Sequence, residues 1–316
     1  MSTSAVSTER HPRERAERRY VLNGQSAMAP ALAGGLYLVA TPIGNLRDIT
    51  VRALEVLAAA DLIACEDTRV SRKLTDHYGL TTPLTPYHDH NAAEARPRLM
   101  ARLAEGAAIA LISDAGTPLV SDPGYKLVRA AREAGVSVTA LPGASAVLAA
   151  LTVSALPTDR FFFEGFLPAK EGQRRARIAE LKRMPATLVL FESGPRIGAT
   201  LADLAAELGA REAAICRELT KLHEEVRRGD LLTLARHYAG EAETRGEFVI
   251  VIAPPDPDSH EATDIDALLR AALARLSVKE AVAEIAAVTG EARREVYQRA
   301  LALNKHQDDP ERDNGG

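Results

Sequence analysis

The chain has 316 residues, of which 46% are hydrophobic, and its formal net charge is only −4. This length and apolar content exceed what one average domain needs, so the composition predicts two domains. The weak net charge excludes a protein that coats nucleic acid through a global positive field, so any RNA binding would need local basic patches. Two cysteines without metal-ligand spacing, Cys65 and Cys216, are predicted to be buried free thiols.

No segment has the signature of a secretory signal or of a membrane span. The first thirty residues are polar and arginine-bearing, and no uninterrupted apolar run is long enough to cross a bilayer. The sequence therefore predicts a soluble, cytoplasmic protein. Residues 1–34 and 305–316 are polar and lack periodicity, and we expect both ends to be disordered.

From Leu36 onward, short apolar runs alternate with segments of helical periodicity. Such alternation predicts an α/β fold with a mostly parallel sheet covered by helices on both faces. The expected strands are 36–41, 61–66, 107–113 and 136–141, and the expected helices are 50–60, 70–77, 92–104, 123–134 and 144–155. The turn residues Leu156-Pro-Thr-Asp-Arg160 then interrupt the pattern and predict the end of an N-terminal α/β domain over residues 35–157.

A second α/β domain is predicted over residues 158–255, followed by a helical appendage over residues 262–304. The appendage is alanine-rich, and Ser277 stands three residues before Glu280 as a capping box. It predicts about three short helices in the manner of a helix-turn-helix, whose arginines either touch nucleic acid or decorate a solvated face. The expected strands of the second domain are 161–165, 186–192, 212–219 and 248–253, its helices are 172–183, 195–208 and 230–239, and the arginines of the appendage are Arg293, Arg294 and Arg299.

Three glycine-bearing turns, 41–48, 113–124 and 142–145, follow three of the predicted strands. Because the carboxyl ends of parallel strands meet at one edge of a sheet, these turns predict a small-molecule pocket there. None of these turns has the sequence of a Walker loop or of a dinucleotide-binding fingerprint. Small residues beside Asp114 suit a ligand with a flat ring, hydroxyls and an amino-acid head group better than a triphosphate.

Five runs of this sequence resemble the tetrapyrrole-methylase-like (class III) S-adenosylmethionine methyltransferases, over about Leu36 to Ala253. The runs are Leu38-Val-Ala-Thr-Pro-Ile-Gly-Asn-Leu-Arg-Asp48, Cys65-Glu-Asp-Thr-Arg69, Ile112-Ser-Asp-Ala-Gly-Thr-Pro-Leu-Val-Ser-Asp-Pro-Gly124, Leu141-Pro-Gly-Ala-Ser-Ala146 and Phe163-Glu-Gly-Phe-Leu-Pro168. The resemblance implies two α/β domains with S-adenosylmethionine in the cleft between them, and a homodimer. The first run differs from the glycine-rich loop of porphyrin-modifying members, and this favours the branch that 2′-O-methylates a cytidine in 16S rRNA of the small ribosomal subunit.

The resemblance also implies where the cofactor and the RNA bind. The substrate side would be lined by the first loop, and the segment Arg217-Glu-Leu-Thr-Lys221 would approach the cofactor. The implied cofactor contacts are Ser113, Asp114, Ala115, Gly116, Thr117, Gly143, Ala144, Ser145, Phe191, Glu192, Glu218, Gly246 and Glu247, and the first-loop substrate contacts are Thr41, Pro42, Gly44 and Asn45.

A ribose hydroxyl must lose its proton during methylation, which makes a nearby base useful. Glu66 and Asp67 are the candidates, with Arg69 as a substrate contact, although a salt-bridged turn that orders the strand end is an equal alternative for this run. His88 and His90 would point the same way in an extended segment but lack a third ligand. We therefore expect them in a polar loop on the substrate side and expect no metal.

A basic segment, residues 170–183, is the predicted contact for RNA phosphates. At helical spacing Arg174 and Arg177 share a side while Ile178 leans toward the core, although an ordinary solvated helix face is the alternative. Scarce aromatic residues argue against a broad base-stacking platform and favour a splayed-out target nucleotide. The cations of the segment are Lys170, Arg174, Arg175, Arg177, Lys182 and Arg183.

Two other functions stay open at this point. The first is methylation of a tetrapyrrole or of a diphthine precursor, but a small acidic macrocycle needs neither the basic segment nor the helical appendage. The second is a non-catalytic RNA-binding factor for ribosome assembly with a vestigial cofactor pocket. Equilibrium binding of S-adenosylmethionine distinguishes this second alternative from an enzyme.

Overall fold

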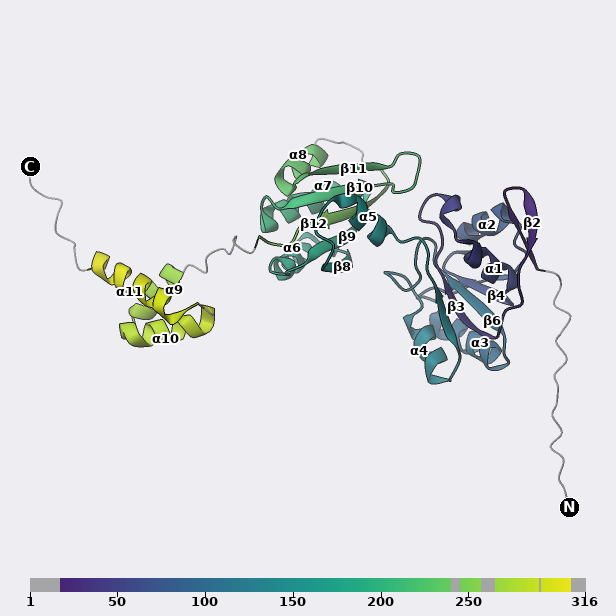
Figure 1. The fold of residues 1–316 in the computed structure, drawn as a ribbon, viewed down its shortest axis with the longest axis horizontal. Helices are drawn as coiled ribbons and strands as arrows, with labels where there is room; N and C mark the ends of the chain where they lie inside the picture. The colour runs from purple at the N-terminus through teal and green to yellow at the C-terminus, as the bar shows by residue number, and fades with distance from the viewer. Residues whose placement is uncertain (1–17, 240–244, 257–264, 290, 308–316) are drawn as a thin grey trace, which may run out of the picture. The chain divides into compact units, whose positions relative to one another are not determined.

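The structure is a computed structural model that describes residues 18–239, 245–256, 265–289 and 291–307 (Figure 1). It divides into two compact units, residues 1–254 and 255–316. The first unit holds two five-stranded sheets flanked by helices, and the second holds three helices. The α/β fold class is thus confirmed. No helix in the described ranges combines the length and the hydropathy needed to span a membrane.

The first sheet is entirely parallel, with strand order β5-β4-β6-β3-β7. Every residue of β4 and of β6 is buried, which explains their continuous apolar runs, because a parallel sheet is covered on both faces. Helices α1 and α2 cover one face and α3 and α4 cover the other. The bounds are β3 Gly35–Val39, β4 Leu62–Cys65, β5 Leu84–Pro86, β6 Ala108–Ile112, β7 Val138–Leu141, α1 Val51–Ala59, α2 Thr68–His77, α3 Ala92–Ala104 and α4 Tyr125–Glu133, with a short 3-10 helix at Leu46–Asp48.

The second sheet is mixed, with strand order β11-β10-β12-β9-β8. Only β8 and β9 pair in parallel, and the other neighbours are antiparallel. The bounds are β8 Phe161–Phe166, β9 Thr187–Ser193, β10 Glu212–Arg217, β11 Glu225–Asp230, β12 Glu247–Ile252, α5 Ala146–Ser154, α6 Glu171–Leu181, α7 Gly194–Leu208 and α8 Leu231–Ala239.

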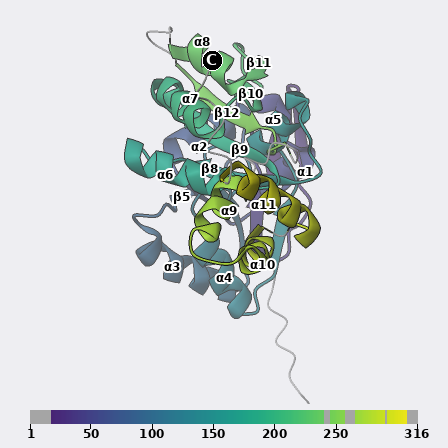
Figure 2. The same cartoon turned by 90° about the vertical axis from the view of Figure 1, so that its left-hand side faces the viewer.

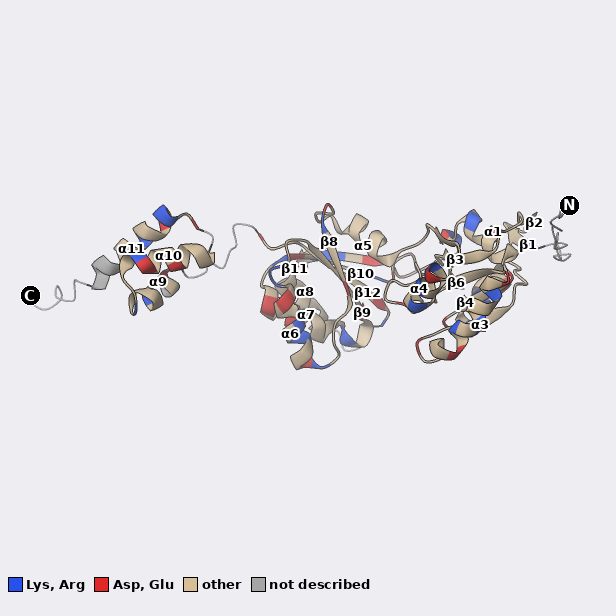
Figure 3. Ribbon diagram, turned by 90° about the horizontal axis from the view of Figure 1, so that it is seen from below, with Lys and Arg blue, Asp and Glu red and all other residues tan. Residues whose placement is uncertain are grey.

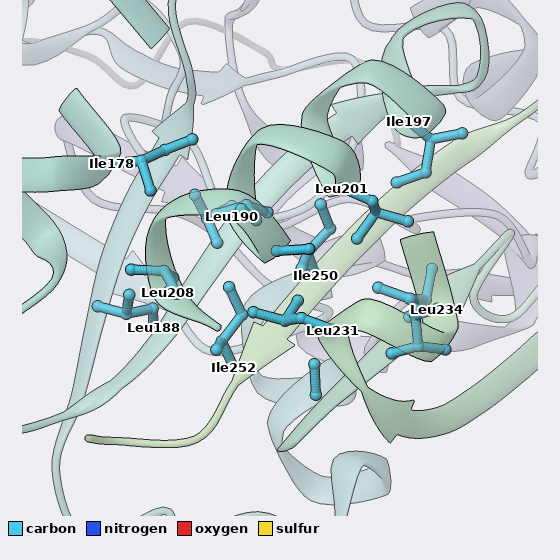
Figure 4. Packing of buried hydrophobic residues seen from close by; sticks show 14 of the residues in the cluster. Ile178, Leu188, Leu190, Ile197, Leu201, Leu208, Leu231, Leu234, Ile250 and Ile252 are labelled. Carbon is cyan, nitrogen blue, oxygen red and sulfur yellow. The ribbon is translucent and has the colours of Figure 1, made fainter. Parts of the chain in front are cut away.

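Alternate residues of the second sheet face two different layers of helices, as the period of a strand requires. Leu188, Leu190 and Ile250 pack with α6, α7 and α8 (Figure 4). Val189 and Cys216 pack against α5 instead, and Figure 2 shows α5 across the strands from α7 and α8. Both cysteines of the chain, one in each sheet, are buried and free, as predicted.

The packing of helix α5 does not follow the predicted domain boundary. It precedes the turn at 156–160, yet its Val147, Ala150 and Leu151 belong to the core of the second sheet. The turn therefore marks the end of α5, where Ala155 adopts a left-handed conformation with φ of 61°, and not a change of sheet. The predicted N-terminal domain, residues 35–157, includes one helix that packs with the other sheet.

The predicted disorder of residues 1–34 is corrected for residues 18–34. Strands β1 (Arg19–Leu22) and β2 (Gln25–Met28) form an antiparallel hairpin around Asn23 and Gly24, which both have positive φ. An Asn-Gly pair favours this type of turn, so the sequence contained a signal for the hairpin. Arg18 anchors the hairpin by donating to the carbonyl oxygens of Ala59 and Ala60 at the end of α1. Residues 1–17 and 308–316 lie outside the described residues, and residues 305–307 belong to α11.

The second unit contains the three predicted helices, α9 (Ile265–Leu273), α10 (Val278–Thr289) and α11 (Arg293–Gln307). Leu269, Ile285 and Val296, one from each helix, are buried in a common core. The capping box at the start of α10 is confirmed, because the Ser277 N–H donates to Glu280 Oε2 at 3.1 Å and the Glu280 N–H donates to Ser277 Oγ at 3.4 Å.

Candidate functional site

Loops at the carboxyl edge of the first sheet are joined by hydrogen bonds. Thr41 and Gly116 exchange both of their backbone hydrogen bonds at 2.9 Å. The Thr117 hydroxyl donates to the Ala144 carbonyl at 3.2 Å, and the Asp67 N–H donates to Asp114 Oδ1 at 3.1 Å. The structure therefore brings together the three predicted glycine turns and the Glu66–Asp67 pair at the end of β4.

Carboxylates are concentrated at this edge of the sheet, which makes its potential negative. Burial raises the pKa of Glu66, and the nearby carboxylates of Asp114, Asp122 and Asp89 raise it further. Burial is also the main cause that raises the pKa of Asp114 and of Asp122. A cationic ligand would relieve the repulsion among these groups, whereas a polyphosphate would add to it.

Asp67 differs from these other carboxylates because its negative charge is paired with a cation. The Arg69 guanidinium donates to both carboxylate oxygens of Asp67, at 2.7 Å to Oδ2, and these hydrogen bonds lower the pKa of Asp67 to about 2. The Asp67 side chain also caps α2 by accepting from the Arg69 N–H. Asp67 is therefore a poor proton acceptor, and Glu66 is the better one of the predicted pair.

The loop between β10 and β11 meets the first loop of the first sheet. The Asn45 N–H donates to Thr220 Oγ1 at 3.1 Å, and a Cβ added to Gly44 would lie 2.4 Å from Lys221 Cγ and 2.9 Å from the Leu219 carbonyl oxygen. Only glycine fits at position 44 without displacing this loop. The contact brings the predicted substrate residues of the first loop to the predicted segment 217–221.

A lysine clamp holds the same loop in place. Lys221 Nζ pairs with Glu218 Oε1 at 2.8 Å and with the Glu247 carboxylate, while the Glu247 N–H donates to Glu218 Oε1 at 2.9 Å. Glu218 and Thr220 both have positive φ, at 48° and 65°, which is an uncommon conformation for these residues. Such backbone strain is typical of functional loops that their surroundings hold in shape.

Glu192 and Phe191, two other predicted cofactor contacts, lie at the end of β9. The Glu192 side chain is fully buried, and it accepts hydrogen bonds from the Ser193 N–H at 2.8 Å and the Thr200 hydroxyl at 2.7 Å. Arg196 pairs with it at 3.2 Å. Its oxygens are thus committed to the protein, which favours a positioning role. The Phe191 ring packs against the Phe163 ring, with their centroids 4.9 Å apart.

The predicted RNA-binding face of α6 requires a correction. Arg174 is buried and pairs with Asp203 of α7 at 2.7 Å. Arg177 donates to both oxygens of Glu164, and Arg175 pairs with Glu207 at 3.1 Å. Acidic residues that are distant in sequence neutralise these three arginines. Lys170, in contrast, is exposed at the start of the helix.

An exposed basic surface lies instead on α2. Arg69, Arg72 and Lys73 line a hollow of about 460 Å³ together with Thr68 and Asp76. Within the described residues, neither Arg72 nor Lys73 has an ion-pair partner. Figure 3 shows Lys and Arg in blue along the ribbon of the first unit. Sequence reasoning singled out Arg69 alone, although the i, i+3, i+4 spacing of the three cations on α2 was the available signal.

His88 and His90 lie in a turn, which corrects the expected extended segment. The His88 N–H donates to Asn91 Oδ1 at 2.9 Å, and the two imidazole centroids are 6.0 Å apart. The turn leads directly into α3. Across the described ranges, no group of three His, Cys, Asp or Glu side chains is arranged to hold a metal ion.

Two family models match the chain. The model described as Tetrapyrrole (Corrin/Porphyrin) Methylases matches residues 35–235, and the model described as RsmI C-terminal HTH domain matches residues 259–304. Solved structures share the fold. Diphthine synthase has a TM-score of 0.54 at 19% identity, covering 69% of this chain and 89% of that one, and a cobalt precorrin-4 methyltransferase has a TM-score of 0.52 at 17% identity, covering 69% and 94%.

Several relatives are similar over nearly their whole length. A protein of Mesorhizobium japonicum is 54% identical over 87% of this chain and 94% of its own length, and one of Pseudomonas aeruginosa is 45% identical over 85% and 97%. A relative from Escherichia coli O157:H7 is 45% identical over 85% of this chain and 95% of its own. All three are named ribosomal RNA small subunit methyltransferase I.

Proposed function

Because this chain belongs to the tetrapyrrole methylase family and, within it, to the ribosomal RNA small subunit methyltransferase I group, we propose that it transfers a methyl group from S-adenosylmethionine to the 2′-hydroxyl of a cytidine in 16S rRNA. One observation of the structure carries the proposal. The strand-end loops of the first sheet, joined by the Thr41–Gly116 bridge, present an acidic edge, and the β10–β11 loop meets them at Gly44. This site suits a positively charged ligand.

The residues present fit S-adenosylmethionine. When bound, it supplies a methyl group that its positive sulfonium has already activated. Asp114 commits Oδ1 to the Asp67 N–H, and the hydrogen bonds of the described residues leave Oδ2 available for a ribose hydroxyl or an ammonium group. We propose that Asp114 and the backbone of residues 113–117 and 143–145 hold the cofactor, and that the loop clamped by Lys221 positions it from the second sheet.

Glu66 is the proposed acceptor of the ribose proton. Its raised pKa makes it a stronger base than an ordinary carboxylate, while Asp67 remains paired with Arg69. A base of this kind is useful because the hydroxyl oxygen must lose its proton at or after attack. The first loop, with Thr41, Pro42 and Asn45, would align the ribose and exclude water. Such alignment contributes on the order of 7–11 kcal/mol in favourable cases.

The charge of the site requires cations next to it. RNA carries one negative charge per phosphate, and the carboxylates around Glu66 would repel the backbone. Helix α2 begins two residues after Glu66, and its Arg69, Arg72 and Lys73 line an exposed hollow. We propose that α2 holds phosphates that flank the target nucleotide.

Asp114→Ala tests where the cofactor binds. Titration calorimetry with S-adenosylmethionine is expected to show affinity at least about tenfold lower than for the wild type, since a hydrogen bond to a charged group contributes about 1.5–3 kcal/mol. The matched control is Asp159→Ala, which removes an exposed aspartate from the turn after α5. Wild-type affinity in Asp114→Ala would show that the pocket lies elsewhere. No binding by the wild type would favour a non-catalytic assembly factor.

Glu66→Gln tests the proton acceptor through the pH dependence of methylation. The wild type is expected to lose kcat/KM on the acid side at a pH above the ordinary glutamate pKa, because Glu66 must be deprotonated and its pKa is raised. Glu66→Gln should lower kcat about 10²-fold or more and flatten this limb. Glu94→Gln, an exposed glutamate of α3, is the control. A variant that keeps the acid limb of the wild type would exclude Glu66.

The substrate itself is tested by mass-spectrometric mapping of rRNA from cells that lack this protein. One missing ribose methyl on a 16S rRNA cytidine is the expected result, and an unchanged methylation map would reject the substrate.

The family also leads us to propose a homodimer, which sedimentation analysis would detect. A ribosomal substrate would place the protein in the cytoplasm.

A further inference from the structure

The C-terminal unit has a groove between α10 and α11 that the methylation site does not use. Val282 and Ala283 of α10 form its apolar floor, and the Tyr297 ring of α11 lies beside them with 46% of its surface exposed. The hollow measures about 350 Å³, which is within the range of small-ligand pockets, about 300–1,000 Å³. Its remaining lining residues are the cations Lys279, Arg293 and Arg294.

These three cations are not used inside the unit. All three are exposed, and in the described part of the chain none of them has an ion-pair partner. Elsewhere in the unit, by contrast, Arg275 pairs with Glu284 and Arg299 lies 3.9 Å from Asp266. Among the residues that the structure describes, no acidic side chain lines the groove. Figure 3 shows Lys and Arg along the helices of this unit.

The position of two of these cations gives a second, independent indication. Arg293 and Arg294 are the first two residues of α11, and Glu295 in the same turn is the acidic residue that a helix start favours. The N-terminal end of a helix carries partial positive charge, so cations there destabilise the helix slightly, and acidic residues are preferred. Helix stability therefore does not explain the two arginines, whereas an anion bound beside them does.

We propose that this groove binds a single-stranded segment of RNA, with phosphates on Lys279, Arg293 and Arg294 and one base against the Tyr297 ring. The combination of a basic groove and an exposed ring is how proteins hold unpaired nucleotides. An acidic peptide would use the cations and leave the ring without a stacking partner. The identity of the RNA rests on the proposed function. Because both units are one chain, binding here would raise the concentration of substrate at the first unit.

Charge reversal in the full-length protein tests the phosphate contacts. Arg293→Glu with Arg294→Glu is suitable because glutamates in the first turn favour the helix, so the unit is expected to stay folded. Fluorescence anisotropy with a labelled single-stranded oligoribonucleotide should show binding weakened about tenfold or more. The slope of log K against log salt should fall by about 1.4, since each single-strand phosphate contact contributes about 0.7. The matched control is Arg270→Glu with Lys126→Glu, which reverses two exposed cations outside the groove and changes the net charge by the same amount, and it should bind as the wild type does.

Substitution of the ring tests the base contact separately. Tyr297→Ala is expected to weaken binding about five- to 150-fold, as for other stacked bases, while Tyr297→Phe keeps it. An affinity and a salt slope that are unchanged in the arginine double variant would overturn the proposal. Loss of binding in that variant together with displacement of the RNA by a polyglutamate peptide at equal concentration would also overturn it, because the groove would then bind acidic chains in general.

The same variants separate this proposal from the proposed function. Methylation of 16S rRNA and calorimetric binding of S-adenosylmethionine are measured beside RNA binding. If the wild type binds the oligoribonucleotide through the groove but methylates no rRNA, the proposed function fails and the groove stands. If the wild type methylates rRNA and groove variants bind RNA normally, the proposed function stands and the groove proposal fails.

Discussion

Helices α6 and α2 each carry three basic residues within five or fewer positions, but their surroundings differ. On α6, Arg174 and Arg175 pair with acids of α7, and Arg177 pairs with Glu164 of β8. On α2, Arg72 and Lys73 line an exposed hollow and have no ion-pair partner in the described residues. A basic run stays available to an anionic ligand only where the rest of the fold supplies no acids to neutralise it.

The location of the neutralising acids explains why the sequence alone misleads here. Asp203 follows Arg174 by 29 residues, and Glu164 precedes Arg177 by 13. Neither spacing is visible in a window of one helix. The only acid among the lining residues of the α2 hollow, Asp76, is on the same helix. The two helices should therefore respond differently when their cations are removed.

Arg174→Met is expected to give the largest effect, a loss of stability. Removing one partner of a buried ion pair leaves an unpaired buried charge, here Asp203, and costs about 3–5 kcal/mol. Urea denaturation measures the free energy of unfolding. Arg174→Met combined with Asp203→Leu should recover most of the loss, because a buried pair can be replaced by apolar side chains. If Arg174→Met were as stable as the wild type but bound RNA weakly, the basic-surface interpretation of α6 would return.

Arg72→Glu with Lys73→Glu should do the opposite, with a loss of substrate affinity at unchanged stability. Both side chains are exposed, so the melting temperature is expected to stay within the range of ordinary surface changes. The value of kcat/KM for rRNA should fall about tenfold or more, and the salt slope of RNA binding should fall by about 0.7 for each lost contact with a single-strand phosphate. Lys126→Glu with Arg132→Glu, on the exposed face of α4, is the matched control. Equal losses in the two double variants would mean that overall charge matters and α2 does not.

The fold could be predicted where burial leaves a continuous apolar pattern. Strands β4 and β6 are buried on both faces, and their runs stand out in the sequence. Strands β5 and β11 lie at the edges of their sheets and were missed. Edge strands tolerate polar and charged residues and proline, and Pro86 of β5 and the Arg227-Arg228 pair of β11 interrupt the apolar pattern there. The other two edge strands, β7 and β8, keep apolar runs and were predicted.

The candidate site was predictable as far as strand ends determine it. Parallel strands place their following loops at one edge, which brings Thr41, Gly116 and Ala144 together without knowledge of side-chain contacts. The contact of Gly44 with Lys221 was not predictable, because it joins loops of two sheets far apart in sequence. The packing of α5 on the second sheet was not predictable either, because nothing in the sequence of α5 specifies which of the two sheets it packs against.

Arg69→Ala tests whether α2 contributes to the acidic edge as well as to RNA binding. Without the guanidinium, the pKa of Asp67 should rise from about 2 toward the ordinary aspartate value of 3.8. NMR titration of the Asp67 carboxyl would measure it. In the wild type this lowered pKa stabilises the fold at pH values above the unfolded pKa and is lost as the pH falls through the folded value. An Asp67 pKa that stayed near 2 in Arg69→Ala would assign the lowering to the helix cap, where the backbone N–H groups of Arg69 and Val70 donate.

Arg175→Ala should show the smallest effect and completes the comparison of the two helices. Its side chain is 47% exposed and pairs with Glu207 at 3.1 Å and with Glu171 at 3.9 Å. Exposed pairs contribute about 0.2–1 kcal/mol, so the urea midpoint should move slightly and the affinity for RNA should not change measurably. A clear loss of RNA affinity in Arg175→Ala would mean that RNA displaces Glu207 from this arginine. In that case an ion pair with an acid of the same protein would not suffice to keep a surface arginine from binding RNA. The same competition between RNA and an acidic side chain would then have to be tested for Arg177 and Glu164.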